Sequence, residues 1–313
     1  MMTPELSSLI LAEKPKIPGG GEDAFAYRFN SAEDGFIAVF DGCGGMGAKK
    51  YASADGLTGA FLGSRTAAFL SDFYYHQNGF WKSDDCADDY RDFVSNGFSR
   101  VKNGLSDSSG VLIKGNMFRE LPTTAALAAV RSTPNNTVMC RYLWAGDSRG
   151  YFLDSDGMCQ VTADEFYTEE DAFSNLRSDA KLKNVIHAGQ SFHISSRTIQ
   201  LNSPTAVIVA TDGAFGYLLT PMHFEHLLLS TMLEASSEGE WQAGIVRALS
   251  PVSGDDFALI AALFGFESFG SAKEYFAPRY EELCREYIVP SAGADDDTLL
   301  ALWNSYKANY YRR

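Results

Sequence analysis

Acidic residues recur where apolar runs of this chain begin or end. Glu22 and Asp23 precede one such run, Asp41 closes the next, Asp212 closes a third and Asp255 opens the last. If these runs are strands, their ends meet at sheet edges and the carboxylates converge. Clustered carboxylates repel one another and resist ionising, so they require cations, and oxygen ligands select hard ions such as Mg²⁺ and Mn²⁺. The pattern therefore predicts a divalent metal centre.

Two of these acids belong to Asp-Gly pairs, which on their own usually mark only a turn. Asp41-Gly42 and Asp212-Gly213, however, each directly follow a run that is apolar enough to be a buried strand. This placement favours a functional interpretation of both pairs.

A glycine-rich segment follows Asp41. Residues 42–47 match the G-x-G-x-x-G pattern of dinucleotide-binding turns between a strand and a helix. Asp41 would face the pyrophosphate with like charge, and no strand ending in an acid follows about 20 residues later, where that fingerprint needs one. A Walker phosphate loop also fails, because Ala48 stands where its lysine should be. Nucleotide binding is therefore disfavoured.

Three weaker candidates are set aside. His223 and His226 lie three apart on an expected helix, but no third ligand is near in sequence, so packing is the favoured interpretation. Ser148 does not lie in a nucleophile elbow. The Asp297 segment imitates the Asp255 motif, but a helical pattern follows it where a strand follows Asp255.

The apolar pattern also predicts the elements that must hold these acids. Strands are expected at residues 25–29, 36–40, 123–130, 137–145, 151–153, 158–162, 197–201, 206–210 and 257–266. Helices are expected at 48–75, 84–105, 221–233, 240–249, 273–287 and 295–310. A polar segment at 163–190, also expected to be helical, interrupts the strands as an inserted lobe would. Long consecutive helices between hairpin-connected strands favour antiparallel sheets covered by helices over a regular βαβ series.

Composition excludes several classes of function. The chain has 313 residues, 45% of them hydrophobic, and 26 Lys+Arg against 40 Asp+Glu give a net charge of −14. Nucleic acid and anionic membrane surfaces would be repelled. The 5 cysteines form no C-x-x-C pair, and no secretion signal or membrane-spanning run is found. We therefore expect a cytoplasmic protein that binds neither nucleic acid nor membranes.

The ordered motifs together resemble a known family, the metal-dependent (type 2C, or PPM) Ser/Thr protein phosphatases. The motifs are Glu22-Asp23-Ala24, Val39-Phe40-Asp41-Gly42-Cys43-Gly44-Gly45, Thr123-Thr124-Ala125, Ala145-Gly146-Asp147-Ser148-Arg149, Ala210-Thr211-Asp212-Gly213 and Gly254-Asp255-Asp256. The resemblance implies an α+β fold in which two antiparallel sheets form a sandwich flanked by helices, in four layers (αββα). It covers residues 20–266, with a flap-like insertion at 163–196, after a leader at 1–19 and before a helical extension at 267–313.

The resemblance also implies a two-metal site that uses Mn²⁺ or Mg²⁺. Asp41 would bridge both ions, Asp212 and Asp255 would complete one, and the carbonyl of Gly42 would reach the other. Glu22 and Asp23 would hold metal-bound waters, and Asp23 and Asp41 would serve catalysis. A water shared by the two ions would attack the phosphorus of phosphoserine or phosphothreonine in a protein substrate. A Ser/Thr kinase or that kinase's targets would be the partners.

This sequence departs from the family pattern at three points. The arginine that usually precedes the Glu-Asp pair is missing, and Lys16 is the expected substitute, although lysine lacks the bidentate fork. Cys43 replaces a histidine proposed as general acid. Asp147 matches a residue of a third metal site, but Gly216 stands where its partner aspartate would be.

A second function remains open for this sequence. The missing arginine favours a catalytically weak or inactive member of the fold that binds and regulates a partner. The presence of Asp41, Asp212 and Asp255 favours catalysis. The extension at 267–313 is expected to pack as helices on the domain, outside the active centre.

Overall fold

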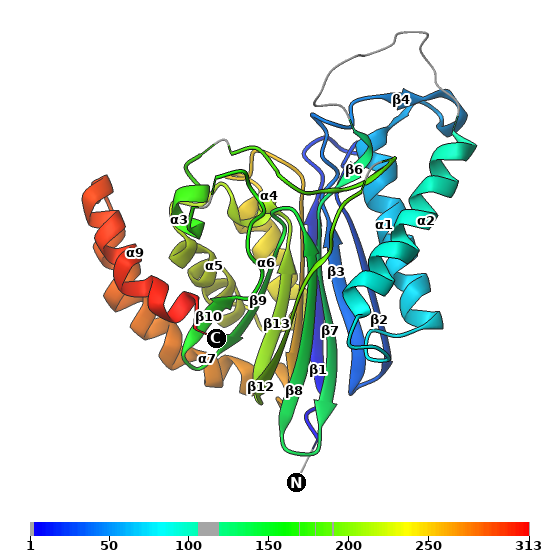
Figure 1. Cartoon of the computed structure of the whole chain (residues 1–313). Coiled ribbons are helices and arrows are strands. Elements are labelled where there is room, and N and C mark those ends of the chain that lie inside the picture. The colour runs from blue at the N-terminus through cyan, green and yellow to red at the C-terminus, as the bar shows by residue number, and fades with distance from the viewer. Residues whose placement is uncertain (1–2, 106–118, 169, 179, 190, 313) are drawn as a thin grey trace.

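Two sheets form the centre of the molecule (Figure 1). The computed structural model describes residues 3–105, 119–168, 170–178, 180–189 and 191–312. Within these ranges, two five-stranded antiparallel sheets are found, along with two small two-stranded ones. The first large sheet has the order β12-β8-β7-β3-β2. Its strands are β12 (Ser195–Asn202), β8 (Thr137–Ala145), β7 (Ala125–Thr133), β3 (Asp34–Phe40) and β2 (Ala24–Ser31).

The second large sheet has the order β1-β14-β13-β9-β10. Its strands are β1 (Leu6–Lys14), β14 (Phe257–Phe264), β13 (Thr205–Ala210), β9 (Arg149–Asp154) and β10 (Gly157–Gln160). The small sheets pair β4 (Lys50–Tyr51) with β5 (Leu57–Thr58), and β6 (Glu120–Thr123) with β11 (Ile186–Ala188).

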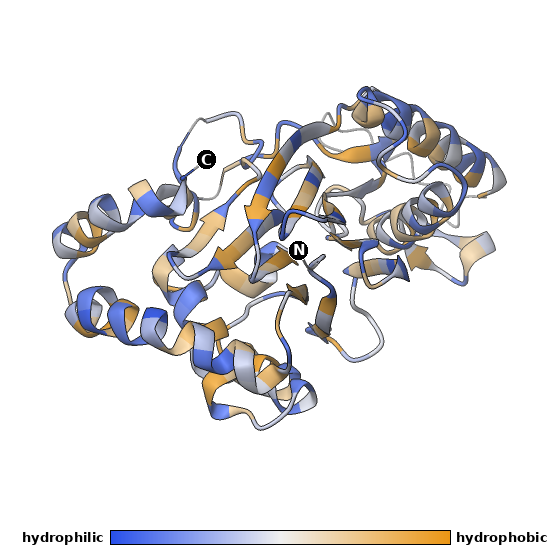
Figure 2. Ribbon diagram, turned by 90° about the horizontal axis from the view of Figure 1, so that it is seen from below, coloured by the Kyte–Doolittle hydropathy of each residue, from blue (hydrophilic) through white to orange (hydrophobic). Residues whose placement is uncertain are grey.

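The alternation of side chains along each strand produces the layers. On β3, Ile37 and Val39 enter a core shared with the second sheet, whereas Phe36 and its alternate neighbours enter a core beneath helices. Both faces of β14 are buried, with Ile260 toward the first sheet and Leu259 toward helices. Strand residues point to opposite faces in turn, so a strand with helices on one side and a sheet on the other is apolar throughout. Figure 2 shows the largely hydrophobic strands between helices that carry hydrophilic stretches.

Helices form the two outer layers. α1 (Gly59–Gln77) and α2 (Cys86–Gly104) cover the first sheet. The helices on the second sheet are α4 (Asp212–Phe215), α5 (Pro221–Glu234), α6 (Glu238–Leu249), α7 (Phe269–Leu283) and α9 (Asp296–Tyr310), with α3 (Ala172–Asn175) nearby. The predicted α+β sandwich in four layers is thus confirmed.

Two segments differ from the sequence-based expectation of helix. Residues 163–190 are mostly irregular, with α3 and β11 as short regular pieces of the described part. Residues 48–58 form β4, a 3₁₀ turn η1 (Ala52–Ala54) and β5, so the long helix begins only at Gly59. Thr58 caps this helix by accepting a hydrogen bond from the Phe61 N–H at 3.1 Å. The antiparallel pair of β4 and β5 thus takes the place of the first part of the predicted helix.

The predicted leader contains a strand of the domain. Residues 6–14 pair along their length with β14, from Leu6 opposite Phe264 to Lys14 opposite Phe257. Ile10 and Ala12 are buried in the core beneath the helices. This part of the leader is therefore built into the second sheet; Met1 and Met2 lie outside the described residues.

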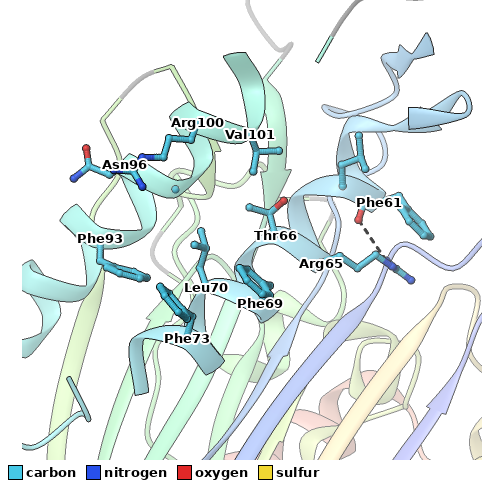
Figure 3. A pocket seen from close by; sticks show the side chains of 12 residues that line it. Phe61, Arg65, Thr66, Phe69, Leu70, Phe73, Phe93, Asn96, Arg100 and Val101 are labelled. Atoms are coloured by element: carbon cyan, nitrogen blue, oxygen red, sulfur yellow. Dashed lines mark hydrogen bonds between the residues drawn. The ribbon is translucent and has the colours of Figure 1, made fainter. Parts of the chain in front are cut away.

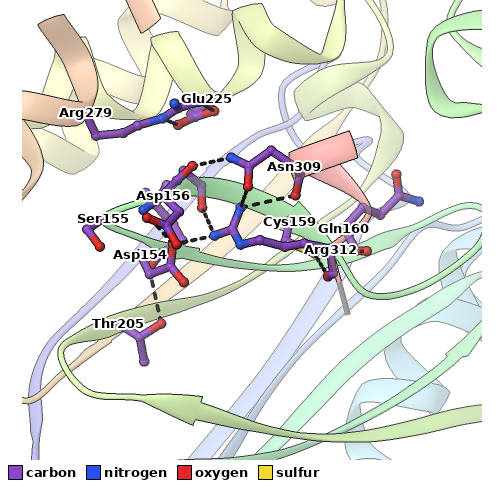
Figure 4. Close-up of polar contacts among 12 residues, drawn as sticks. Asp154, Ser155, Asp156, Cys159, Gln160, Thr205, Glu225, Arg279, Asn309 and Arg312 are labelled. Atoms are coloured by element: carbon purple, nitrogen blue, oxygen red, sulfur yellow. Dashed lines mark hydrogen bonds and ion pairs between the residues drawn. The ribbon is translucent and has the colours of Figure 1, made fainter. Parts of the chain in front are cut away.

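The C-terminal extension is helical and packs on the second sheet. α7 continues through a π-helical turn, η2 (Cys284–Ile288), and α8 (Val289–Ser291) before α9. Phe276 and Trp303 are fully buried in the core that this sheet shares with its helices. Figure 4 shows two polar anchors: Arg279 binds Glu225 of α5 at 2.7 Å and 3.1 Å, and Arg312 binds Asp154. The extension is thus part of the folded core.

Candidate functional site

The strand register brings the predicted acids to one edge of the sandwich. Ala24 of β2 pairs with Phe40 of β3, so Asp23 and Asp41, the next residues outward, are neighbours. In the second sheet Ala210 of β13 pairs with Leu259 of β14, which places Asp212 and Asp255 at the same end of that sheet.

The charges of these acids act on one another. Burial raises the pKa of Asp41 well above its usual value, and nearby carboxylates raise it further. Those carboxylates belong to Asp212, Asp23, Asp147 and Asp255. Burial likewise raises the pKa of Asp23 to about 8, with Asp212 adding to the effect, and raises that of Asp212 to about 6, with Asp255 adding to it. Three other predicted ligands, Asp23, Asp212 and Asp255, therefore form one electrostatic cluster with Asp41.

Hydroxyl donors hold the Glu-Asp pair in place. The Thr211 hydroxyl, at the end of β13, donates to Asp23 at 2.7 Å, and the Thr58 hydroxyl donates to Glu22. The pKa of Glu22 is raised by burial, although the Thr58 hydrogen bond lowers it. Gly44 lies against Glu22, because a Cβ at Gly44 would be 2.4 Å from its Oε2. A side chain at position 44 would therefore have to displace the Glu22 carboxylate.

Asp147 lies beside the cluster on the turn between β8 and β9. Burial and the charge of Asp212 raise its pKa well above the usual value. Within the described residues its buried Oδ1 has no hydrogen-bond partner. Asp147, Asp212 and Gly216 all line one polar cavity of about 430 Å³. Gly216 carries no side-chain oxygen, so it offers this cavity no ligand opposite Asp147.

Two arginines approach the acids, and the sequence pattern pointed to neither. Arg149 forms an ion pair with Asp164 at 2.6 Å in which both side chains are only 3% exposed. Its charge also lowers the pKa of Asp147 and of Asp212, against the larger effect of their burial. Arg65 of α1 donates to the carbonyls of Gly21 at 2.9 Å and Glu22 at 3.2 Å. Its guanidinium lowers the pKa of Glu22.

Lys16, the expected phosphate-binding residue, meets the acids through its backbone. Its N–H donates to Asp256 Oδ1 at 2.6 Å, and the N–H of Glu22 donates to Asp256 Oδ2 at 2.5 Å. Asp256 therefore fixes the course of residues 16–22, while the Lys16 side chain is exposed. Arg65 is the cation that the structure brings to the Glu-Asp pair, through tertiary packing that no local motif encodes.

Cys43 lies in the same region. Burial raises the pKa of its thiol well above the usual value, and the charge of Asp41 raises it further. A thiol held neutral in this way is a poor proton shuttle near neutral pH.

The donor set suits oxygen-ligated divalent ions in chemical type. Buried carboxylates that raise one another's pKa, together with the orphaned oxygen of Asp147, need positive charge nearby. Across the described part of the chain, however, no three His, Cys, Asp or Glu side chains are grouped closely enough to hold one ion as they stand. Cation binding would therefore have to draw the carboxylates closer together.

The histidines of α5 have structural roles. His223 bonds the Thr220 hydroxyl at 2.8 Å through Nδ1, and the ring of His226 stacks on Tyr280 with centroids 5.5 Å apart. Both contacts support the packing interpretation.

No helix in the described ranges is long and apolar enough to cross a membrane. No protein-family model matches the chain, and no curated protein matches it in sequence.

Solved structures nevertheless match its fold. The serine/threonine phosphatase Stp1 from Staphylococcus aureus superposes with a TM-score of 0.59 at 15% identity, over 84% of this chain and 97% of that one. PppA, a regulatory component of T6SS in Pseudomonas aeruginosa, gives 0.55 at 18% identity, over 84% and 100%. The catalytic domain of the phosphatase PstP, in complex with two manganese ions, gives 0.53 at 13% identity, over 84% and 98%. The resemblance to the type 2C family is therefore confirmed at the level of the fold: this chain has the architecture of the bacterial serine/threonine phosphatases.

Proposed function

We propose that this protein is a metal-dependent phosphatase that hydrolyses phosphoserine and phosphothreonine in proteins. The observation that carries the proposal is the convergence of Asp23, Asp41, Asp212 and Asp255 from two sheets on one edge of the sandwich. The fold shared with serine/threonine phosphatases, one of them bound to two manganese ions, supports it.

The residues of this chain have distinct tasks under the proposal. Asp41, Asp212, Asp255 and the carbonyl of Gly42 would hold two Mn²⁺ or Mg²⁺ ions, with Glu22 and Asp23 around them. Ions bound there would supply Lewis-acid polarisation of the phosphate and an activated water. The hydroxyls of Thr58 and Thr211 orient Glu22 and Asp23. The neutral thiol of Cys43 would take no part in proton transfer.

The protein environment of the proposed enzyme follows from the same features. The substrate would be a phosphoprotein, and a Ser/Thr kinase or that kinase's targets would be its partners. In the described residues no disulfide joins the cysteines, as is usual in a reducing cytoplasm.

A second candidate function has an observation in its favour. No arginine precedes the Glu22-Asp23 pair in the sequence, where the family's phosphate-binding residue is expected. In the described part of the chain the carboxylates are not grouped as a ready metal site. A partner-binding module with weak or no catalysis would tolerate both features.

Hydrolysis of para-nitrophenyl phosphate and of a phosphothreonine peptide, with Mn²⁺ and with chelator, distinguishes the two functions. The phosphatase should turn over both substrates only when Mn²⁺ is present. Folded protein with no Mn²⁺-dependent turnover would leave the partner-binding module as the function.

A further inference from the structure

α1 and α2 enclose a groove on the outer surface of the first sheet's helical layer (Figure 3). The two helices touch where Leu70 meets Gly97, and a Cβ at Gly97 would lie 2.4 Å from Leu70 Cδ1. Any larger residue at this position would have to displace the Leu70 side chain. Beside the contact the helices leave a cavity of about 610 Å³.

One end of the groove is aromatic and unusually exposed. Phe69 is 68% exposed and Phe73 39% exposed, and their rings stack with centroids 6.0 Å apart. Phe93 of α2 closes this end, with its ring centroid 6.1 Å from that of Phe73. Residues four apart share one face of a helix, so Phe69 and Phe73 form a continuous apolar stripe. Contiguous exposed aromatic surface of this kind marks interaction sites.

The other end of the groove is cationic. Because Phe73 meets Phe93 and Leu70 meets Gly97, the helices run antiparallel, which brings Arg65 and Arg100 to the same end. The Arg65 guanidinium is held by backbone carbonyls, whereas Arg100 is exposed and forms no ion pair within the described residues. None of the described residues that line the groove is acidic, although the chain has 40 Asp+Glu against 26 Lys+Arg.

Arg65 faces the carboxylates of the acidic edge, among them Asp23 and Asp256, so Arg100 is the cation that this end of the groove offers to a ligand. Two acids on the helices are paired with other cations. On α1, Asp72 is paired with Arg28 at 2.6 Å, and on α2, Asp92 is paired with Arg91 at 2.8 Å. The groove therefore combines an apolar floor with positive charge at one end.

We propose that this groove docks a segment of a partner protein that presents large apolar side chains on one helical face and a carboxylate at one end. Amphipathic helices bind grooves of this type through side chains spaced i, i+3, i+4 and i+7. The carboxylate would meet Arg100, and the apolar side chains would cover Phe69 and Phe73. A second copy of this chain fits less well, since two bodies that each carry a net charge of −14 repel one another.

Arg65 places the docked segment close to the acidic cluster. It lines the groove and also binds the carbonyls of Gly21 and Glu22. A partner held here would lie beside the proposed catalytic edge, but the docking itself does not depend on phosphatase activity.

Synthetic peptides test the proposal on the full chain by fluorescence anisotropy. The probes are amphipathic helical peptides with Leu and Phe at i, i+3, i+4 and i+7, carrying two Glu at either the N-terminal or the C-terminal end, and matched peptides with Lys at those positions. Of the two Glu peptides, the one whose Glu residues reach Arg100 should bind more tightly than the matched Lys peptide. The difference in affinity between these two peptides should decrease as the salt concentration rises. Phe69→Ser should weaken binding at least about fivefold, as truncation of a central aromatic anchor does.

Charge reversal provides the decisive comparison. Arg100→Glu should make the protein bind the Lys peptide more tightly than the Glu peptide. The control is Arg285→Glu, because the Arg285 side chain is 69% exposed on the C-terminal helices, away from the groove; it should leave the preference for the Glu peptide unchanged. Equal binding of Glu and Lys peptides, no binding, or binding insensitive to Phe69→Ser would overturn the proposal. Self-association in sedimentation that Phe69→Ser abolishes would overturn it in favour of a second copy.

Discussion

Besides burial, four other carboxylates of the candidate site raise the pKa of Asp41. It lies at the end of β3, and carboxylates from both sheets disfavour its ionised form. A buried carboxylate in this position is tolerated when a cation offsets the repulsion or when the group stays protonated. The role proposed for Asp41 as a bridge between two ions follows from this central position.

Replacing Asp41 tests that role. Asp41→Asn keeps the shape of the side chain but removes its charge, so both ion sites weaken together and Mn²⁺-dependent turnover should be lost. Asp297→Asn is a matched control, because Asp297 lies exposed in a similar acidic run on α9 and should leave turnover unchanged. Residual activity of Asp41→Asn within about tenfold of wild type, about 1.4 kcal/mol in barrier, would exclude the bridging role.

At this scale the sequence identified the acids but not their cations. Asp41 and Asp212 follow apolar runs, a pattern that is visible locally. Arg65 approaches Glu22 from the middle of α1, and Arg149 forms an ion pair with Asp164. Both arrangements depend on how helix, turn and insertion pack together, which no spacing along the chain encodes. Lys16 is near the Glu-Asp pair in sequence, but the structure brings its backbone N–H, and not its side chain, to the acidic edge.

Elements with strong periodicity were predicted closely. The alternating run at 137–145 is β8, and the strand expected at 206–210 lies within β13. β1 was missed because its short apolar stretch is stabilised by pairing with β14, about 250 residues away. The insertion at 163–190 was expected to be helical, but its polar side chains bind the scaffold instead: Glu165 accepts from the Gly146 N–H at 2.9 Å. Tertiary contacts outweighed local propensity in both cases.

The C-terminal helices offer a test at the level of elements. Arg279 of α7 is 5% exposed, and its partner Glu225 of α5 is fully buried. The hydroxyl of Tyr306 on α9 also donates to Glu225, so this carboxylate joins three helices. Removing one partner of a buried pair leaves an uncompensated charge. The extension should therefore depend on Glu225 for its attachment.

Glu225→Gln should lower the free energy of unfolding by about 3 kcal/mol, measured by urea denaturation. Glu282→Gln removes the other carboxylate that binds Arg279, but that side chain is 46% exposed, so the expected loss is only about 0–1 kcal/mol. If both variants lost the same free energy of unfolding, burial of the Glu225–Arg279 ion pair would not increase its contribution to stability. Phosphatase activity should survive in folded Glu225→Gln, since α5 and α7 supply none of the proposed ligands.

At the scale of the whole molecule, carboxylates that repel one another gather at one edge of the sandwich. Half-buried carboxylates from the two sheets meet beyond the ends of β3 and β13. The sandwich core and both helical layers hold these strand ends in place, so the carboxylates cannot separate without loss of packing. Stability and ion binding should therefore be linked through the same residues.

This linkage predicts a pH-dependent stability in the absence of divalent ions. The pKa of Asp23 is about 8 and that of Asp212 about 6 in the folded protein, both raised from the usual 3.8. The folded state thus binds more protons than the unfolded state between pH about 4 and 8, and stability in chelator should fall as pH rises through this window. Asp41→Asn removes a carboxyl group whose ionisation the folded state disfavours, so it should raise the melting temperature in chelator at pH 8 and raise it less at pH 5.

In the presence of Mn²⁺, stability should no longer fall as pH rises, because metal ligands must be deprotonated and Mn²⁺ binding favours the folded state. At 100 times the dissociation constant the gain is about 2.7 kcal/mol, or a few degrees in melting temperature, and it should be larger at pH 8 than at pH 5. Asp41→Asn should lose most of this gain, whereas Asp297→Asn, which changes the net charge equally, should keep it. The measurement is thermal unfolding of the three proteins in chelator and in Mn²⁺ at fixed ionic strength, so that screening is not mistaken for binding. If the wild-type melting temperature ignored Mn²⁺ at pH 8, the acidic edge would not be a metal centre, and the phosphatase proposal would fail with it.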